Sequence, residues 1–197
     1  PAVTEKENHS VAADPAKPVV IILSAKNSER LMDYAKNVLH FIQTEPAINL
    51  VDLAYTLQVG RDPMEERLGL MVHSMKELVE KLQDFVAGRH GALATVYAGQ
   101  VKRNKEAVAE FNAHENKQKI MDQWLASESM DKILDLWVKG LAFDWNRLYN
   151  GTRPKRISMP TYPFAREAYW VDTVIEEKSI DIKSSTDQVP QSFTHGN

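Results

Sequence analysis

The chain has 197 residues, of which 43% are hydrophobic and 26% are charged, and its formal net charge is −3. The composition is ordinary for a globular domain, and so small a net charge does not favour binding to nucleic acid or to an anionic membrane. The absence of cysteine excludes disulfides, thiolate zinc sites and cysteine nucleophiles. We therefore expect a cytoplasmic protein without a membrane segment or a nucleic-acid partner.

The two ends of the chain lack hydrophobic periodicity. Residues 1–17 mix Pro, Ala, Glu and Lys, and residues 183–188 are Lys-Ser-Ser-Thr-Asp-Gln. Such segments behave as linkers because they carry too little apolar surface to form a core. We predict a linker from a preceding domain at 1–17, a folded domain at 18–172 and a disordered linker at 173–197. The first residue, Pro1, is not a methionine, which favours a piece of a longer protein.

The folded part opens with a β-branched run at 19–23, which predicts a buried strand. Apolar residues spaced three and four apart then predict a helix that begins at Asn27 or Ser28 and ends before Pro46. A second, shorter helix is predicted from a cap at Asn49 to a stop at Gly60.

The alternation of Leu68, Leu70 and Val72 predicts a second strand that places one face on a core. Ser74 and Glu77 have the spacing of a capping box and predict a third helix. Residues 94–98 are rich in Val, Thr and Tyr and predict a third strand. The first hundred residues thus predict the order β-α-α-β-α-β, a small sheet with helices packed on it.

The pattern is helical from 104 to 139 and predicts that Trp124 and Trp137 lie in the core. Residues 156–164, followed by Tyr169 and Trp170, are extended instead, because Pro160 and Pro163 interrupt helical hydrogen bonding. The predicted fold class is α+β: a small three-stranded sheet with packed helices, a helical insert and an extended aromatic C-terminal arm. The arm is too short to form its own core, so it lies along this domain or reaches a neighbouring one.

The chain carries no recognisable catalytic motif. Its six histidines lack a partner at metal-ligand spacing, its eight glycines form no phosphate-binding loop, and no serine has a nucleophile-elbow context. We predict no catalytic residue, no cofactor and no metal. The alternative of a small hydrolase requires an unrecognised Ser/His pair. The basic stretches at 102–105 and 153–156 are interpreted as solvated, with an acidic partner surface as an alternative for the second.

Three stretches of the sequence are similar to segments of modular type I polyketide synthases. Met159-Pro160-Thr161-Tyr162-Pro163-Phe164-Ala165-Arg166, with Tyr169-Trp170, resembles the Leu-Pro-Thr-Tyr-Pro-Phe…Tyr-Trp arm of that family. Residues 53–61 resemble the linker that follows a ketosynthase, and residues 137–149 also match. Met159 stands where leucine is usual, and Ala168 stands where arginine is common. The resemblance covers about 18–172.

The resemblance implies a synthase of the trans-acyltransferase type, in which a separate acyltransferase loads the extender units. Only about 60 residues separate the third strand from the arm, and the acyltransferase motif Gly-His-Ser-x-Gly is absent. The alternative is a structural linker from a synthase that carries its own acyltransferase, but the continuous helical pattern between Tyr97 and Trp137 shows no sign of a deletion.

The resemblance also implies a non-catalytic scaffold or docking segment of a larger synthase, which takes part in polyketide biosynthesis. Its expected partner is the ketosynthase domain of the same chain, and a free-standing acyltransferase and neighbouring synthase copies are further candidates. The insert at about 104–139 corresponds to a region that mediates lateral contacts between synthases in relatives. The predicted interface residues are Pro160, Thr161, Tyr162, Pro163, Phe164, Tyr169 and Trp170.

Overall fold

The computed structural model describes residues 16–89, 95–160 and 162. The predicted linkers and the predicted domain end at 172 fall largely outside these residues and stay predictions. The elements, in chain order, are β1 (Val19–Ala25), α1 (Ser28–Thr44), α2 (Leu50–Val59), β2 (Glu66–Val72), α3 (Met75–Val86), β3 (Val96–Gln100), η2 (Val101–Asn104), α4 (Lys105–Ala113), α5 (Lys117–Ala126), α6 (Met130–Lys139) and η3 (Trp145–Tyr149).

The three strands form one antiparallel sheet in the order β1-β2-β3. The register places Ile21 opposite Leu70 in the first pair and Leu70 opposite Val96 in the second. The third strand begins at Val96, two residues later than the predicted range of 94–98. The predicted α+β fold with a three-stranded sheet is confirmed.

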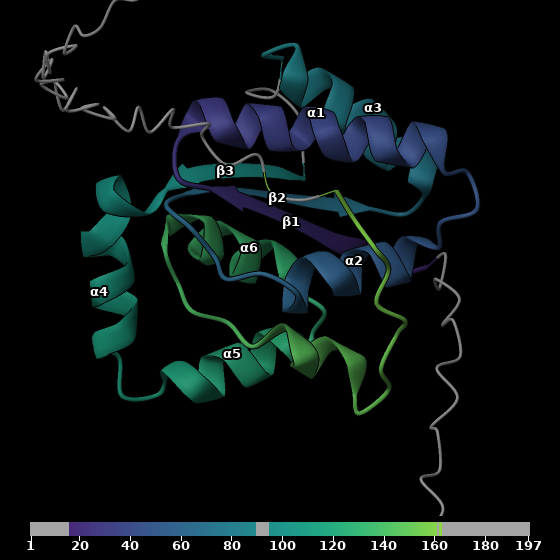
Figure 1. Cartoon of the computed structure of the whole chain (residues 1–197). Coiled ribbons are helices and arrows are strands. Elements are labelled where there is room, and N and C mark those ends of the chain that lie inside the picture. Colours follow the sequence, from purple (N-terminus) through teal and green to yellow (C-terminus); the bar gives the residue numbers. More distant parts are fainter. Residues whose placement is uncertain (1–15, 90–94, 161, 163–197) are drawn as a thin grey trace, which may run out of the picture. The chain divides into compact units, whose positions relative to one another are not determined.

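The sheet is covered on both faces (Figure 1), and this gives the protein two hydrophobic cores. Because successive strand side chains point to opposite faces, Ile21 and Leu23 enter the first core, whereas Val20 and Ile22 enter the second. Helices α1 and α3 pack together on the first face, and α6 packs against β2 and β3 on the second. The predicted alternation in β2 therefore holds, but its second face is also covered.

The first three helices begin at the predicted caps. The Asn27 Oδ1 accepts a hydrogen bond from the backbone N–H of Arg30 at 2.9 Å. The Asn49 Oδ1 accepts from Val51 N–H at 2.8 Å, and Ser74 Oγ accepts from the N–H at Glu77. Each cap satisfies a backbone donor that the helix itself leaves unpaired, so these starts are fixed by local sequence.

The helical region predicted at 104–139 consists of three α-helices, α4, α5 and α6. Helix α6 is the part that supplies the second core, where Trp137 is 1% exposed. The Trp145 ring packs edge-on against the Trp137 ring at a centroid distance of 5.8 Å. Trp124 is half-buried and stacks on Phe111 at 5.5 Å. The segment expected to be an insert is therefore, in its last helix, a structural layer of the domain.

Two glycines allow α6 to lie close to the sheet. A Cβ atom added at Gly99 would stand 2.6 Å from the carbonyl oxygen of Val138, and one added at Gly69 would stand 2.6 Å from Leu134 Cδ2. Glycine permits such an approach because it has no side chain. Arg67 then ties the end of α6 to β2, since its guanidinium donates to the carbonyl oxygens of Trp137 at 2.8 Å and Leu141 at 3.2 Å.

We expect Gly99→Ala to lower the free energy of unfolding by about 1–3 kcal/mol, because the new methyl group meets backbone that cannot move aside. Gly69→Ala is the matched control, with a smaller expected loss, since its methyl group meets the end of a flexible leucine side chain. Urea unfolding of both full-length variants measures the difference. An equal or larger loss for Gly69→Ala would contradict this account of the contact.

Candidate interface: an arm held against two helices

The segment that leads into the predicted arm runs along α2 towards α1 (Figure 1), and hydrogen bonds hold it there. The backbone N–H of Lys155 donates to Asp52 Oδ1 at 2.8 Å, and that of Ile157 donates to Thr56 Oγ1 at 3.0 Å. Asp52 is 4% exposed although it is an acid. A buried carboxylate is tolerated where it accepts hydrogen bonds, so Asp52 is a structural acceptor for the arm.

The spacing of these two bonds matches the geometry of the two segments. Asp52 and Thr56 are four residues apart on α2, which corresponds to a rise of about 6 Å. Lys155 and Ile157 are two residues apart in extended chain, which spans about 6.6 Å. The extended segment therefore stays in register with one face of the helix over a full turn.

Arg61 continues the contact beyond the end of α2. Its guanidinium donates to the carbonyl oxygen of Pro160 at 2.7 Å and lies over the ring of Tyr34 at 5.0 Å from the centroid. The backbone N–H of Lys26 donates to the Tyr162 hydroxyl at 3.0 Å, and the Tyr162 ring meets the Tyr34 ring edge-on at 5.9 Å. The guanidinium over the Tyr34 ring and the edge-on contact of the two tyrosine rings are both favourable arrangements. Tyr162 is therefore held by the hydrogen bond to its hydroxyl and by the packing of its ring.

Tyr34 is the buried centre of this cluster and is 1% exposed. Burial raises the pKa of Tyr34 to about 12, and the positive charge of Arg61 acts in the opposite direction. The hydroxyl is therefore a neutral donor at neutral pH. Within the described part of the chain it has no hydrogen-bond partner. An unsatisfied buried hydroxyl is costly and calls for an explanation.

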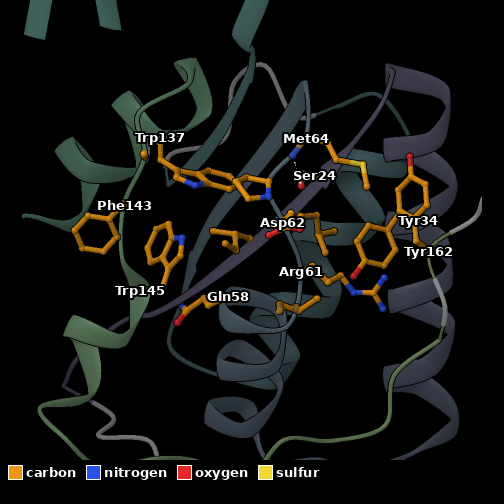
Figure 2. A pocket seen from close by; sticks show the side chains of 15 residues that line it. Ser24, Tyr34, Gln58, Arg61, Asp62, Met64, Trp137, Phe143, Trp145 and Tyr162 are labelled. Carbon is orange, nitrogen blue, oxygen red and sulfur yellow. Dashed lines mark hydrogen bonds between the residues drawn. The ribbon is translucent and has the colours of Figure 1, made fainter. Parts of the chain in front are cut away.

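A cavity of about 350 Å³ opens beside this cluster, between the two cores. Figure 2 shows Tyr34, Tyr162 and Arg61 gathered at one end of the cavity and Trp137, Phe143 and Trp145 at the other. Ser24, at the end of β1, lies between them, and its Oγ accepts from Met64 N–H at 3.0 Å. The cavity thus joins the arm-binding cluster to the second core.

The outer edge of β1 is closed by a second polar contact. Gln58 on α2 is 5% exposed, and its Nε2 donates to the carbonyl oxygen of Val20 at 2.7 Å. The Tyr149 hydroxyl donates to Gln58 Oε1 at 2.7 Å, and burial raises the pKa of Tyr149 well above its usual value. An edge strand with free backbone groups is a template for unwanted pairing, so this contact also protects the sheet.

Of the predicted interface residues, the structure describes Pro160 and Tyr162. Both pack against this domain itself, so at these positions the arm lies along its own domain. The other five residues lie outside the described part of the chain, and their contacts stay predictions: Thr161, Pro163, Phe164, Tyr169 and Trp170.

The residues that receive the arm were not predicted from the sequence. Thr56 and Arg61 fall in the stretch 53–61 that resembles a synthase linker, but the pattern assigned them no role. Asp52 carried a weak signal, because an acid on an otherwise apolar helix face is unusual when buried. The backbone of Lys26 carries no side-chain signal at all.

The described residues show neither a metal site nor a membrane helix. Across 16–89, 95–160 and 162, no three His, Asp or Glu side chains are grouped so that they could hold a metal ion. In the same ranges no helix combines the length and the apolar character that crossing a bilayer requires.

Residues 22–89 match the protein family described as "RhiE-like, KS-MAT linker domain". Polyketide synthase PksL of Bacillus subtilis (strain 168) is 50% identical over 158 residues, which make up 79% of this chain and 4% of that protein. Polyketide synthase PksM of the same organism is 44% identical over 155 residues, or 78% of this chain and 4% of that protein.

The solved structures agree with these matches. The ketosynthase from module 6 of the bacillaene synthase of Bacillus subtilis 168 superposes with a TM-score of 0.73 at 36% identity, over 78% of this chain and 27% of that chain. The chain belongs to the ketosynthase-flanking linker domains of polyketide synthases. This confirms the resemblance to trans-acyltransferase synthases drawn from the motifs. The linker domain spans a small part of the relatives that it matches, 4% of PksL and 27% of the ketosynthase chain.

Thr56→Val should release the linker domain's arm at Ile157. The valine keeps the shape of threonine but cannot accept the backbone hydrogen bond, so we expect a loss of about 1 kcal/mol in unfolding free energy. Amide hydrogen exchange should become faster at Ile157 and stay unchanged at Leu78 in the first core. Thr44→Val, on the exposed end of α1, is the matched control; faster exchange at Ile157 in that control would argue against a local clamp.

Two Tyr→Phe variants should have opposite effects in the linker domain. Tyr162→Phe removes a hydroxyl that accepts from Lys26, so unfolding free energy should fall by about 1 kcal/mol. Tyr34→Phe removes a buried hydroxyl without a partner in the described residues, so unfolding free energy should rise by about 1 kcal/mol. Thermal and urea unfolding at neutral pH measure both changes. Destabilisation by Tyr34→Phe would show that its hydroxyl is already satisfied.

Proposed function

We propose that this linker domain is a non-catalytic scaffold that packs on the ketosynthase domain of its own synthase and offers docking surface to further components of the assembly. The match to a linker family and the similarity to ketosynthase structures support this role. The absence of cysteine favours the reducing cytoplasm as the compartment in which the protein functions.

The single observation that carries the proposal is the fastening of the arm. Hydrogen bonds join Lys155 and Ile157 to α2, Pro160 to Arg61, and Tyr162 to Lys26 between β1 and α1. These bonds fix the point at which the chain continues to Phe164, Tyr169 and Trp170. A fixed start lowers the entropy that the following aromatic residues lose when they bind a neighbouring surface. We therefore assign these three residues as anchors on the ketosynthase.

Helices α4 and α5 support contacts with a second kind of partner. Among the described residues, α4 buries Val108 and α5 buries Met121, so most of both helices faces outward. The stacked pair Phe111 and Trp124 remains half-buried between them. Aromatic side chains that are incompletely covered are typical of contact surfaces. We place lateral contacts with neighbouring synthase copies here, with a free-standing acyltransferase as a further partner of the domain.

The anchor assignment predicts the effect of a triple substitution. In the full chain, Phe164→Ala with Tyr169→Ala and Trp170→Ala should weaken binding to the separately produced cognate ketosynthase domain by about thirty-fold, the loss expected for central aromatic anchors. Isothermal titration calorimetry measures the affinity. Tyr162 is left unchanged because it belongs to the first core, and its loss would disturb the domain itself.

Phe193→Ala supplies the matched control, because it removes an aromatic side chain from the predicted C-terminal linker. Equal affinities for wild type, control and triple variant would contradict the anchor assignment. Titration of the cognate free acyltransferase into the chain, with and without the ketosynthase attached, then separates the two remaining roles. Binding to the chain alone makes it a docking domain, and absence of binding leaves it a spacer between domains.

A further inference from the structure

The cavity between the two cores has the properties of a small-molecule site. Its volume of about 350 Å³ lies within the usual range for ligand pockets. Its walls come from β1, α1, the end of α2 and the segment after it, α6, the segment that leads into η3, and the arm at Tyr162. They are mostly apolar, with the aromatic side chains of Trp137, Phe143 and Trp145 at one end. Such walls favour an apolar or aromatic body.

The other end of the cavity offers hydrogen-bond donors. The Tyr34 hydroxyl is buried and lacks a partner within the described residues. Arg61 uses one N–H on Pro160 and lies over the Tyr34 ring, and in the described part of the chain it forms no ion pair. Asp62 also lines the cavity, but it is exposed and its charge is screened by solvent. A phenol donor beside a guanidinium that forms no ion pair within the described residues suits an anionic acceptor.

We propose that this cavity binds a small carboxylic acid with an aromatic or aliphatic body, whose carboxylate accepts from Tyr34 and pairs with Arg61 while its body lies against Trp137 and Trp145. This site goes beyond the scaffold role and does not depend on it. The Tyr34 hydroxyl, which lacks a partner among the described residues, gains one in the complex. The cavity is walled by several segments from different parts of the chain, which suits a compact ligand better than the broad contact of a docked protein.

The test uses the full chain labelled with ¹⁵N and two probes of the same shape and opposite charge, 4-phenylbutyrate and 4-phenylbutylamine. The chain has four tryptophans; the indole N–H signals of Trp137 and Trp145 report on the cavity, and that of Trp124 reports on α5. The carboxylate should shift the signals of Trp137 and Trp145 in a saturable way and leave Trp124, on α5, unchanged. The amine should produce no saturable shift, because Arg61 repels it.

Tyr34→Phe keeps the ring and removes the donor, so the affinity for 4-phenylbutyrate should fall about fivefold, as expected for one neutral hydrogen bond. Arg61→Gln should lower it about tenfold, as expected for a charged one. Thr44→Val on the exposed end of α1 should leave it unchanged. Circular dichroism checks that each variant is folded. If Arg61→Gln also loosens the arm, the affinity of Tyr34→Phe is the measurement that tests the proposal.

Three results would overturn the proposal: no saturable shift at millimolar carboxylate, equal binding of both probes, or full affinity in Tyr34→Phe. Indole shifts at Trp137 and Trp145 on addition of the ketosynthase, with none for the carboxylate, would assign the cavity to a protein contact instead. Loss of ketosynthase binding in the triple anchor variant has no bearing on these outcomes, so failure of the site and failure of the scaffold role are distinguishable.

Discussion

The close seating of α6 on the sheet is the constraint on which the rest of this structure depends. A sheet of three strands buries little apolar surface on one face, and small domains with a single thin core are marginally stable. Here α6 covers the second face and brings Trp137 and Ile133 into a second core. The approach is possible because Gly69 and Gly99 have no side chains where the helix passes. Two cores share one sheet as a result.

Arg67 fixes the C-terminal end of α6 in place on the sheet. It lies on β2 with 7% exposure, and its guanidinium stands 5.0 Å from the centre of the Trp137 ring. Burial lowers the pKa of Arg67, and the negative charge of Glu65 partly offsets this. The buried charge is tolerated because it donates to carbonyl groups at the end of α6, where the helix dipole is negative. A single side chain thus fixes the helix end and joins the strands to the α6 layer.

The position of the arm depends on the sheet, because the arm is bonded to α2 and α2 packs on β1. Helix α2 packs on β1 and presents Asp52 and Thr56 in the register of an extended chain. The arm then reaches the first core at Tyr162, which is 8% exposed. The hydrogen bonds at Lys155, Ile157, Pro160 and Tyr162 fix the described part of the arm on this domain. This fixed arm is the physical support for the proposed scaffold role.

The sequence by itself determined the local elements. The caps Asn27, Asn49 and Ser74, the strand at 19–23 and the extended chain around Pro160 follow from interactions within a few residues. The motif at 159–170 also indicated the family.

The tertiary structure decided what those elements touch. The sequence pattern assigned no core position to Trp145, which lies in the second core, or to Arg67, which is buried on β2. The bond from Ile157 to Thr56 joins residues 101 positions apart. Local periodicity carries no information about such pairs, because their contact depends on how α2, α6 and the sheet pack. Interactions between residues close in sequence thus determined the helices and strands, and a short motif indicated the family. The position of the arm on α2 and the cavity beside it depend on packing between segments that are far apart in the sequence.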